Sequence, residues 1–530
     1  MITGMPEPAD YLRVVAEQNP WQNNATVPPA LAPPHERYLA KQLWQRLRHN
    51  EPRRYQVILG PRRAGKTTVL YQTVRRLLKN GIEPGRILWL RMDHPRLIGE
   101  SLGDLVKLSL RGAAATPERP LYLMLDEIVY AADWDLWLKT FHDEHWPVRV
   151  AATSSSAMAL RKQRRESGVG RWEEHHLLPC DLTEFAELLG TLQTEITMQA
   201  VTEAWAGDTA SPAGESPSGL TLRKMLAALP TGHAPQAFPE QLWSLRTMVG
   251  GFPELVTTLH DWPTDGGVGQ LERYVLESQR VLRSDAVERA VYKDIPQTAG
   301  VDNPLMLERL LYVLADQVTG ILAPTRISKD LGVAQPTLDR YLSYLEQAYL
   351  VFTLTNYSGT EAGMQRRGRK LYFVDSAVRN AALHRGLAPL SDSVEQGILL
   401  ENLVAATLHT LAAHAGVRLH YWRDADREVD LIYDDPQQPL AFEVASSPDH
   451  SRRGLEALIK RHPRFSGNSY LVAPRAAVIQ PDDDSRGVGT LPLDTFLLAV
   501  GTQIRWAALV RLGFCRLERP TRRAGARLCI

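Results

Sequence analysis

The residues most suited to chemistry lie in one short stretch, residues 60–68, which reads GPRRAGKTT. It fits the G-x-x-x-x-G-K-[S/T] pattern, with an apolar run (residues 55–59) before it and a helix-like stretch (residues 69–78) after it. Glycines at both ends allow a tight turn whose N–H groups point inward, and the N-terminus of the helix adds partial positive charge. Such a loop binds the phosphates of a nucleotide. The residues expected to bind it are Gly60, Pro61, Arg62, Arg63, Ala64, Gly65, Lys66, Thr67 and Thr68.

An acidic motif supplies further groups that nucleotide hydrolysis needs. Residues 121–127, LYLMLDE, read as a buried strand that ends in two carboxylates. We expect Lys66 to reach the β- and γ-phosphates, and Thr67 and Asp126 to ligate Mg²⁺. Glu127 would polarise the attacking water. An apolar run ending in Asp-Glu often marks only a strand leaving the core, but its position downstream of a phosphate loop favours the catalytic interpretation.

A polar turn, TSSS at residues 153–156, follows the next apolar strand, residues 146–152. Ligands of parallel α/β sheets lie at the carboxyl ends of the strands, so Ser155 is a candidate sensor of the γ-phosphate. Serine and threonine are also preferred N-caps of helices. The sequence leaves both roles open.

The composition is that of an ordinary globular protein of several domains. The chain has 530 residues, 44% of them hydrophobic and 23% charged, and a formal net charge of +1. Overall charge therefore predicts no polyanionic partner, and any nucleic-acid surface must be local. The three cysteines, at 180, 515 and 529, form neither a disulfide framework nor a zinc pattern, which suits the reducing cytosol. We find no signal-peptide layout and no uninterrupted apolar run of ~18 residues, so we expect a cytoplasmic protein without a membrane span.

The alternation of strands and helices over the first 180 residues predicts a parallel sheet covered on both faces. The segments NPW, GPRRAGKTT, LMLDE, the serine-rich turn, GRW and LTEF resemble the bacterial and archaeal AAA+-type ATPases. More narrowly, the chain is similar to the group in which a DUF4143 region follows the ATPase core. The resemblance implies ATP and Mg²⁺ as cofactors. It also implies a homo-oligomer, for which a ring is the expected form. It also implies that Arg171 is an arginine finger completing a neighbour's site; the alternative is an ordinary surface arginine.

Residues 305–357 carry the pattern of a winged helix. A helix (residues 325–331), a tight turn and a second helix (residues 335–345) precede two expected strands, residues 350–354 and 370–374. An exposed recognition helix and a basic wing favour contact with the DNA backbone, although winged helices also serve as protein-contact modules. The candidate DNA contacts are Gln335, Thr337, Arg340, Arg366, Arg367, Arg369 and Lys370.

The last domain pairs a helix with two strands that carry carboxylates. Glu401 lies on the helix, Asp430 on one strand and Glu443 on the next, an arrangement similar to the PD-(D/E)XK nuclease fold. That pattern has a lysine two residues after the glutamate, where this chain has Ala445. Because the usual cation for stabilising the transition state is missing there, we expect a relic that is inactive as a nuclease. Lys460, on the following helix, is a candidate substitute.

Together these features predict an α/β multidomain fold with a parallel-sheet P-loop ATPase core, a helical lid, a winged helix and a degenerate PD-(D/E)XK-like domain. The expected function is an Mg-ATP-hydrolysing oligomeric motor or switch acting on DNA, possibly branched or damaged. The alternative is a nucleotide-gated sensor or scaffold of a defence or stress response with slow turnover. The expected divisions are an extended N-terminal segment (1–35), ATPase core (36–180), lid (181–300), winged helix (301–378), nuclease-like domain (379–480) and C-terminal tail (481–530).

Overall fold

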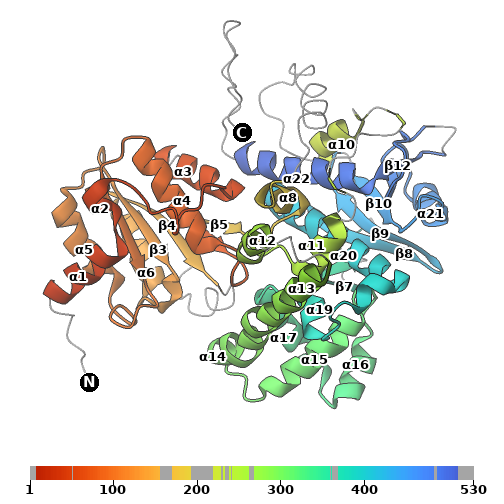
Figure 1. The fold of residues 1–530 in the computed structure, drawn as a ribbon, viewed down its shortest axis with the longest axis horizontal. Coiled ribbons are helices and arrows are strands. Elements are labelled where there is room, and N and C mark those ends of the chain that lie inside the picture. Colours follow the sequence, from red (N-terminus) through yellow and green to blue (C-terminus); the bar gives the residue numbers. More distant parts are fainter. Residues whose placement is uncertain are drawn as a thin grey trace, which may run out of the picture.

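The computed structural model shows a molecule of two halves, an N-terminal α/β domain and a larger C-terminal part built on a second sheet (Figure 1). It describes residues 8–510 apart from 50–51, 156–169, 192–218, 228, 230, 233–237, 240–241, 262–267, 359, 361–367, 438 and 483–485. A stretch rich in arginine near the end of the sequence (516–527) and most of a stretch of small and polar residues (206–219) lie outside the described residues.

The N-terminal domain is a five-stranded parallel sheet with the order β2-β3-β4-β1-β5. Residues that alternate along a strand pack against opposite faces: Val57 and Leu59 join one core with α5 and α6, whereas Ile58 joins another with α3 and α4. The predicted two-sided parallel sheet is confirmed. Its elements are β1 (Tyr55–Leu59), β2 (Ile87–Arg91), β3 (Leu121–Asp126), β4 (Val148–Ser154), β5 (Trp172–His176), α3 (Tyr38–His49), α4 (Lys66–Lys79), α5 (Leu102–Ala113) and α6 (Trp134–Asp143).

The segment expected to be extended, residues 1–35, instead contains two helices, α1 (Pro8–Gln18) and α2 (Trp21–Asn24). The reason is the edge strand β2, whose unpaired backbone needs partners. Asn19, between the two helices, accepts from the Trp89 N–H at 2.7 Å and donates to the Trp89 carbonyl at 2.9 Å. The fully buried Trp21 packs behind it. The helices therefore close one edge of the sheet.

A run of helices follows the core, over the residues where a helical lid and the helices of a winged helix were expected. Between α13 and α14 the chain winds as a π-helix over Arg283–Glu288 and Ala290–Asp294, here called the π-segment. In α17, Leu338, Leu342 and Leu345 are buried on the side that faces the core. The helices are α8 (Leu182–Leu188), α10 (Gly219–Ala227), α11 (Leu242–Val249), α12 (Pro253–His260), α13 (Val268–Leu282), α14 (Ile295–Ala299), α15 (Pro304–Asp316), α16 (Pro324–Leu331), α17 (Gln335–Gln347) and α19 (Ser376–Ala382).

The second sheet has seven strands in the order β12-β11-β10-β9-β8-β6-β7. The two wing strands form one end of it, because β6 pairs antiparallel with β7 and parallel with β8. The sheet thus runs without a break from the expected winged helix into the nuclease-like region. Its strands are β6 (Val351–Asn356), β7 (Arg369–Phe373), β8 (Arg418–Asp424), β9 (Arg427–Asp434), β10 (Leu440–Val444), β11 (Ser469–Ala473) and β12 (Val488–Pro492).

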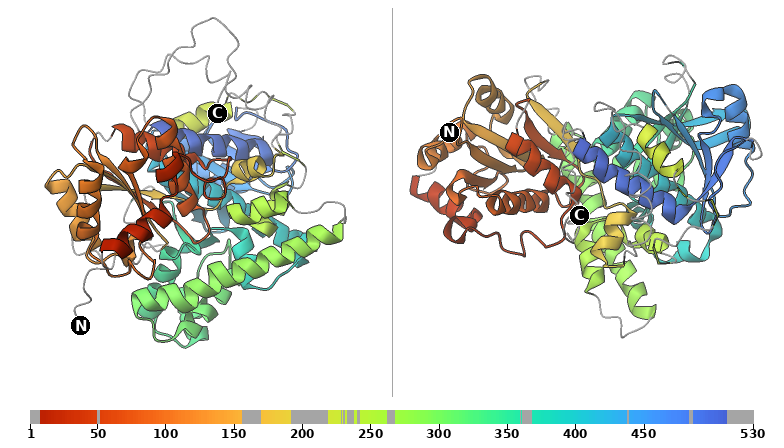
Figure 2. Two further views of the ribbon diagram at one scale, coloured as in Figure 1. Left: turned by 60° about the vertical axis from the view of Figure 1, so that its left-hand side comes forward. Right: turned by 90° about the horizontal axis from the view of Figure 1, so that it is seen from above.

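Three further helices cover this sheet: α20 (Ser393–Ala415), α21 (Arg453–Arg461) and α22 (Leu493–Val510). The expectation that a C-terminal tail begins at residue 481 is wrong up to residue 510, because β12 and α22 contribute to the main hydrophobic core. In Figure 2, α22 (blue) runs between the N-terminal domain and the second sheet. Among the described residues one helix, α20, is long and apolar enough to cross a membrane, and 67% of its most apolar window is buried inside the protein.

Candidate active site

The phosphate loop joins β1 to α4 and depends on its two glycines. A Cβ on Gly60 would lie 2.1 Å from the Leu177 carbonyl oxygen, so no larger residue fits there. Gly65 has φ 88° and is the N-cap of α4, which begins at Lys66. The first N–H groups of α4 therefore face the cavity, where they can bind an anion. This cavity, of about 500 Å³, is large enough for a nucleotide.

Lys66 lies buried in the loop, as the motif predicts. Its Nζ donates to the carbonyl oxygens of Gly60 at 2.9 Å and Pro61 at 2.8 Å. Burial lowers the pKa of this ammonium, opposed by the nearby charges of Glu127 and Asp126. The loop thus holds a desolvated cation beside the phosphate-binding amides, where a phosphate oxygen can replace the carbonyls.

Thr67 and Asp126, the expected magnesium ligands, contact each other. The Thr67 hydroxyl lies 3.0 and 3.1 Å from the two carboxylate oxygens of Asp126. Burial raises the pKa of Asp126 to about 6, although the hydrogen bond from Thr153, 2.7 Å long, opposes the rise. A hydroxyl and a buried carboxylate side by side are ligands that Mg²⁺ accepts, and a cation there would relieve the desolvated charge. The residues present therefore fit Mg²⁺-ATP.

Glu127 stands at the end of β3 in the left-handed region, with φ 53°. This conformation costs a non-glycine residue of order 1–3 kcal/mol and is typical of functional positions. Its carboxylate accepts from both the backbone N–H and the hydroxyl of Ser155, each at 3.1 Å, and its own N–H donates to Thr153 at 2.9 Å. Ser155 thus contacts the candidate catalytic carboxylate. Thr153, which the sequence did not single out, connects Asp126 and Glu127.

Two other arginines of the loop, Arg62 and Arg63, turn away from the sheet and form ion pairs with the C-terminal half. Arg62 binds Asp294 through two hydrogen bonds of 2.6 and 2.8 Å. Arg63 binds Asp285 at 2.5 Å and also pairs with Glu254. Sequence reasoning placed both arginines in the loop but did not find these partners.

Arg37, which the sequence analysis did not single out, binds the loop from the side opposite Arg62 and Arg63. This buried guanidinium donates to the Ala64 carbonyl at 2.6 Å, to the Leu178 carbonyl at 2.9 Å and to both oxygens of Glu184 at 2.9 Å. Desolvation is offset by Glu184 and other neighbours, so its pKa stays above the ordinary value. No local motif marks Arg37, because its partners lie 27 to 147 residues away in the chain.

Arg171 lies at the amino-terminal ends of the strands, whereas the phosphate loop lies at their carboxyl ends. It precedes β5, whose Trp172 pairs with Tyr55 at the start of β1, whereas the loop follows the end of β1. The four residue-to-residue steps along β1 put roughly 13 Å between these two ends of the strand. Its guanidinium donates to Asp143 at 3.0 and 3.1 Å, which lowers the pKa of that carboxyl to about 2. Arg171 cannot serve the site of its own chain, so a catalytic role requires a neighbouring subunit.

A second polar cluster lies in the C-terminal sheet, around Lys370 of β7. Its ammonium is almost fully buried and lies 2.8 Å from Glu401, 2.8 Å from Glu428 and 2.9 Å from Asp430. Tyr372, two residues along the same strand, donates to Glu401 at 2.8 Å. Two of the three carboxylates singled out from the sequence, Glu401 and Asp430, thus meet at this lysine, together with Glu428, which the sequence did not single out.

Comparison with known proteins agrees with this geometry. A family model described as an AAA domain matches residues 52–186, which hold the phosphate loop and the Asp126–Glu127 motif. The chain carries an AAA ATPase domain. Two domains of unknown function follow it, DUF8612 over residues 240–388 and DUF4143 over residues 396–495.

Proteins similar to this chain occur in archaea and bacteria and are described as uncharacterized. One from Methanocaldococcus jannaschii is 25% identical over 415 residues, covering 77% of this chain and 79% of that protein. One from Haemophilus influenzae is 21% identical over 394 residues, covering 73% and 82%. Among solved structures, the Walker-type ATPase PABY2304 of Pyrococcus abyssi is 12% identical with a TM-score of 0.40, covering 64% of this chain and 94% of that one.

The DUF8612 region contains the helices of the expected winged helix, but its wing differs from the expectation. Gln335 and Arg340 are exposed on α17 and Thr337 is half-buried. Arg369 pairs with Asp339 at 2.7 Å, and Arg366 and Arg367 lie outside the described residues. Lys370 is not an exposed wing residue, because it faces the carboxylates of the DUF4143 domain. The alternation along β7 puts Lys370 on the inner face of the sheet with Tyr372.

The carboxylates of the DUF4143 domain are strongly perturbed. Burial, followed by repulsion from Asp430, raises the pKa of Glu401 to about 7 and that of Glu443 to about 9. Ala445 is buried, and its N–H donates to the Val472 carbonyl. Lys460, the expected substitute lysine, is exposed on α21, so the cation of this cluster is Lys370 instead. Across the described ranges, no group of three or more His, Cys, Asp or Glu has the arrangement of a metal site.

Proposed function

We propose that this protein is a cytoplasmic, Mg²⁺-dependent ATPase that assembles into a homo-oligomer, most simply a ring, and acts on DNA. The observation that carries the catalytic part is the single hydrogen-bonded network at the carboxyl ends of β3 and β4. It joins Thr67, Asp126, Thr153, Glu127 and Ser155 beside the loop. Ligands of parallel α/β sheets bind at this edge.

Each residue of the network has a task in hydrolysis. Lys66 exchanges its contacts with the loop carbonyls for oxygens of the β- and γ-phosphates, while the N-terminal amides of α4 hold the phosphate chain. Thr67 and Asp126 would hold Mg²⁺, which neutralises charge on the β- and γ-oxygens. Glu127 orients the attacking water. Ser155 fixes the Glu127 carboxylate and so controls whether it faces that water.

The oligomer part of the proposal rests on the location of Arg171. An arginine finger stabilises charge that develops on the transferred phosphoryl group. Since Arg171 lies at the ends of the strands opposite its own phosphate loop, it can reach only the site of an adjacent subunit. It must then leave Asp143 or carry that ion pair into the interface.

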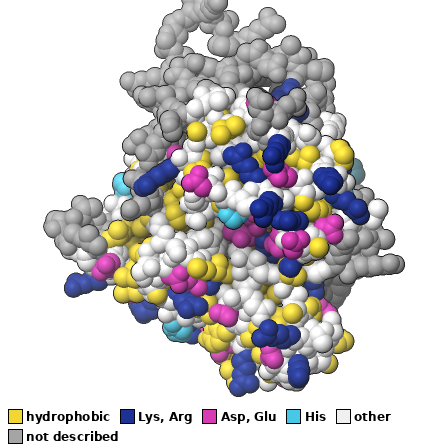
Figure 3. Space-filling model, turned by 90° about the vertical axis from the view of Figure 1, so that its right-hand side faces the viewer, with side chains coloured by type: hydrophobic (Ala, Val, Ile, Leu, Met, Phe, Trp, Pro, Cys, Tyr) yellow, Lys and Arg dark blue, Asp and Glu magenta, His cyan; other side chains and the backbone are white. Residues whose placement is uncertain are grey.

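The DNA part rests on two surfaces of the C-terminal half that expose polar and basic residues. One is the exposed side of α17, with Gln335 and Arg340. The other lies over α21 and the turn after it, on the side of the molecule that Figure 3 faces, where several lysine and arginine side chains are exposed with acidic side chains among them. Its exposed members are Arg453, Lys460, Arg461 and Arg464. Such surfaces suit phosphate-backbone contact.

We also propose that the DUF4143 domain serves to bind DNA or to assemble the oligomer, and that it does not cleave DNA. Lys370 is bound by three carboxylates, so it is not free to stabilise a transition state. Glu401 and Glu443 keep protons to unusually high pH, which weakens them as metal ligands.

Steady-state ATPase assays with and without single-stranded, duplex and forked DNA at matched salt test this function. We expect turnover in the wild type, loss of turnover in Lys66→Ala, and stimulation by at least one DNA form. Absence of turnover with every substrate would refute the ATPase. Turnover that no DNA alters would refute the action on DNA and favour a nucleotide-gated sensor or scaffold.

A further inference from the structure

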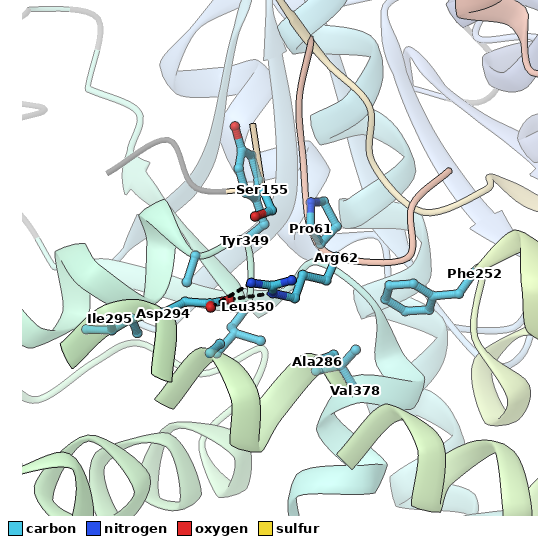
Figure 4. Close-up of a pocket in the computed structure, with 12 residues that line it drawn as sticks. Pro61, Arg62, Ser155, Phe252, Ala286, Asp294, Ile295, Tyr349, Leu350 and Val378 are labelled. Carbon is cyan, nitrogen blue, oxygen red and sulfur yellow. Dashed lines mark hydrogen bonds and ion pairs between the residues drawn. The ribbon is translucent and has the colours of Figure 1, made fainter. Parts of the chain in front are cut away.

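Arg62 lines two neighbouring cavities. It lines the nucleotide cavity together with Lys66, Thr67 and Glu127. It also lines a smaller space next to it, shared with Ser155 from the AAA domain and Tyr349 from the DUF8612 region. Figure 4 shows its guanidinium pointing away from Pro61 toward the helix that carries Asp294. A short rotation of this long side chain changes which space its charge occupies.

The pair between Arg62 and Asp294 uses one whole edge of the guanidinium. Nε donates to one carboxylate oxygen at 2.6 Å and Nη2 to the other at 2.8 Å. Both side chains are largely buried, with 23% and 16% of their surface exposed. Guanidinium binds phosphate in the same two-pronged manner as carboxylate. That edge can therefore hold Asp294 or a phosphate, but not both.

Asp294 belongs to the π-segment, which is unusual in itself. Hydrogen bonds of the i→i+5 type bring residues four to five apart onto one face, and Asp285, Arg289 and Asp294 have this spacing. Asp285 and Arg289 also line the nucleotide cavity. Single turns of π-helix occur frequently at functional sites. Here the winding presents two carboxylates to two consecutive arginines of the phosphate loop.

We infer that Arg62 is a nucleotide-dependent switch contact, which binds Asp294 until the γ-phosphate of ATP takes its place. This inference rests on the proposed binding of ATP. In this cavity, which both Arg62 and Glu127 line, the γ-phosphate of a bound ATP would lie near Glu127, whereas ADP would have no phosphate there. ATP therefore frees Asp294, and ADP leaves it bound. Because the π-segment is itself part of the DUF8612 region, continues into α14 and packs on α15, the release acts directly on that region.

Binding measurements with ATP and ADP test the switch. Asp294→Asn removes the competing carboxylate charge, so ATP should bind about fivefold more tightly or better, while the affinity for ADP changes by less than about twofold. Glu277→Gln is the matched control, because it neutralises an exposed carboxylate of α13 that pairs with Arg280 in the same helix. It should change neither affinity.

A double-mutant cycle isolates the pair. In an Arg62→Ala background, Asp294→Asn should no longer improve ATP binding, and Arg62→Lys should retain part of the difference between ATP and ADP. Amide hydrogen exchange in residues 283–299 should increase with ATP and not with ADP. An equal gain for ATP and ADP, or a gain that persists in Arg62→Ala, would overturn the inference. Failure of the wild type to bind ATP would instead refute the proposed function.

Discussion

Replacing Lys370 by methionine tests the buried cluster that joins the DUF8612 and DUF4143 regions. The substitution keeps the length of the side chain but removes the cation that contacts Glu401, Glu428 and Asp430. Removing one partner of a buried ion pair typically costs about 3–5 kcal/mol, because the other charge stays buried without compensation. We expect a loss in this range at pH 8, below the sum of three separate contacts, since the three share one ammonium.

The loss should depend on pH with a definite sign. The carboxyl pKa values of Glu401 and Glu443 in the folded protein, about 7 and about 9, already exceed the value of about 4.3 in an unfolded chain. Without Lys370, which lowers both, they rise further. The folded variant then binds more protons than its unfolded state, so its stability increases as the pH falls from 8 to 5.5. The destabilisation should therefore be smaller at pH 5.5 than at pH 8.

Calorimetry at the two pH values, together with hydrogen exchange of the amides of β7 and β9, measures this effect. Exchange is needed because a chain of several domains does not unfold in one step. Lys460→Met is the control: it removes the same charge from the exposed side of α21 and should change stability by less than about 0.5 kcal/mol. A Lys370→Met loss below about 1 kcal/mol at pH 8, or one that grows at pH 5.5, would refute the reasoning.

Four other outcomes follow from the two sites. Lys66→Ala should weaken ATP binding, whereas Glu127→Gln should keep binding and trap ATP; wild-type turnover in Glu127→Gln would remove its role with water. Arg171→Ala should bind ATP yet hydrolyse it poorly and regain activity when mixed with Glu127→Gln subunits, and no recovery in co-assembled mixtures would argue against action in trans. Neutralising the basic residues of α21, or Arg366, Arg367 and Arg369 with the buried Lys370 left in place, should lower DNA affinity for all sequences and reduce the salt slope by ~0.9 per lost contact, which a filter-binding series at several salt concentrations measures. The wild type should not cleave linear or forked DNA with Mg²⁺ or Mn²⁺, and cleavage that disappears in Asp430→Ala would show an active nuclease.

The phosphate loop and the Asp126–Glu127 motif could be predicted because their chemistry is local. A few consecutive residues fix the turn, the start of the helix and the end of the strand. Arg37 and Asp294 could not be found in this way, since each acts on the loop from a distant part of the chain. Their types and neighbours in the sequence are those of ordinary charged surface residues.

Lys370 shows a different reason for a wrong prediction. The run RRGRK reads as a solvated basic turn, and the two arginines before the glycine support that interpretation. The strand begins at Arg369, however, so the period of two sends Lys370 inward and Arg369 outward to Asp339. The useful signal was the pairing of Lys370 with Tyr372, two polar-tipped residues on one face of a strand, opposite a helix that carries Glu401.

The phosphate loop is held between two sets of charges that both lead to the C-terminal half. On one side Arg62 binds Asp294 of the π-segment. On the other, Arg37 holds the Ala64 carbonyl and Glu184 of α8, and Glu187 of the same helix binds Arg505 of α22 at 2.7 Å. A loop that moves to accept phosphates must therefore disturb contacts that also fix α8 and the π-segment. The long α22 packs in the core of the DUF4143 domain. The contacts of Arg37, α8 and Arg505 therefore link the phosphate loop to the second sheet.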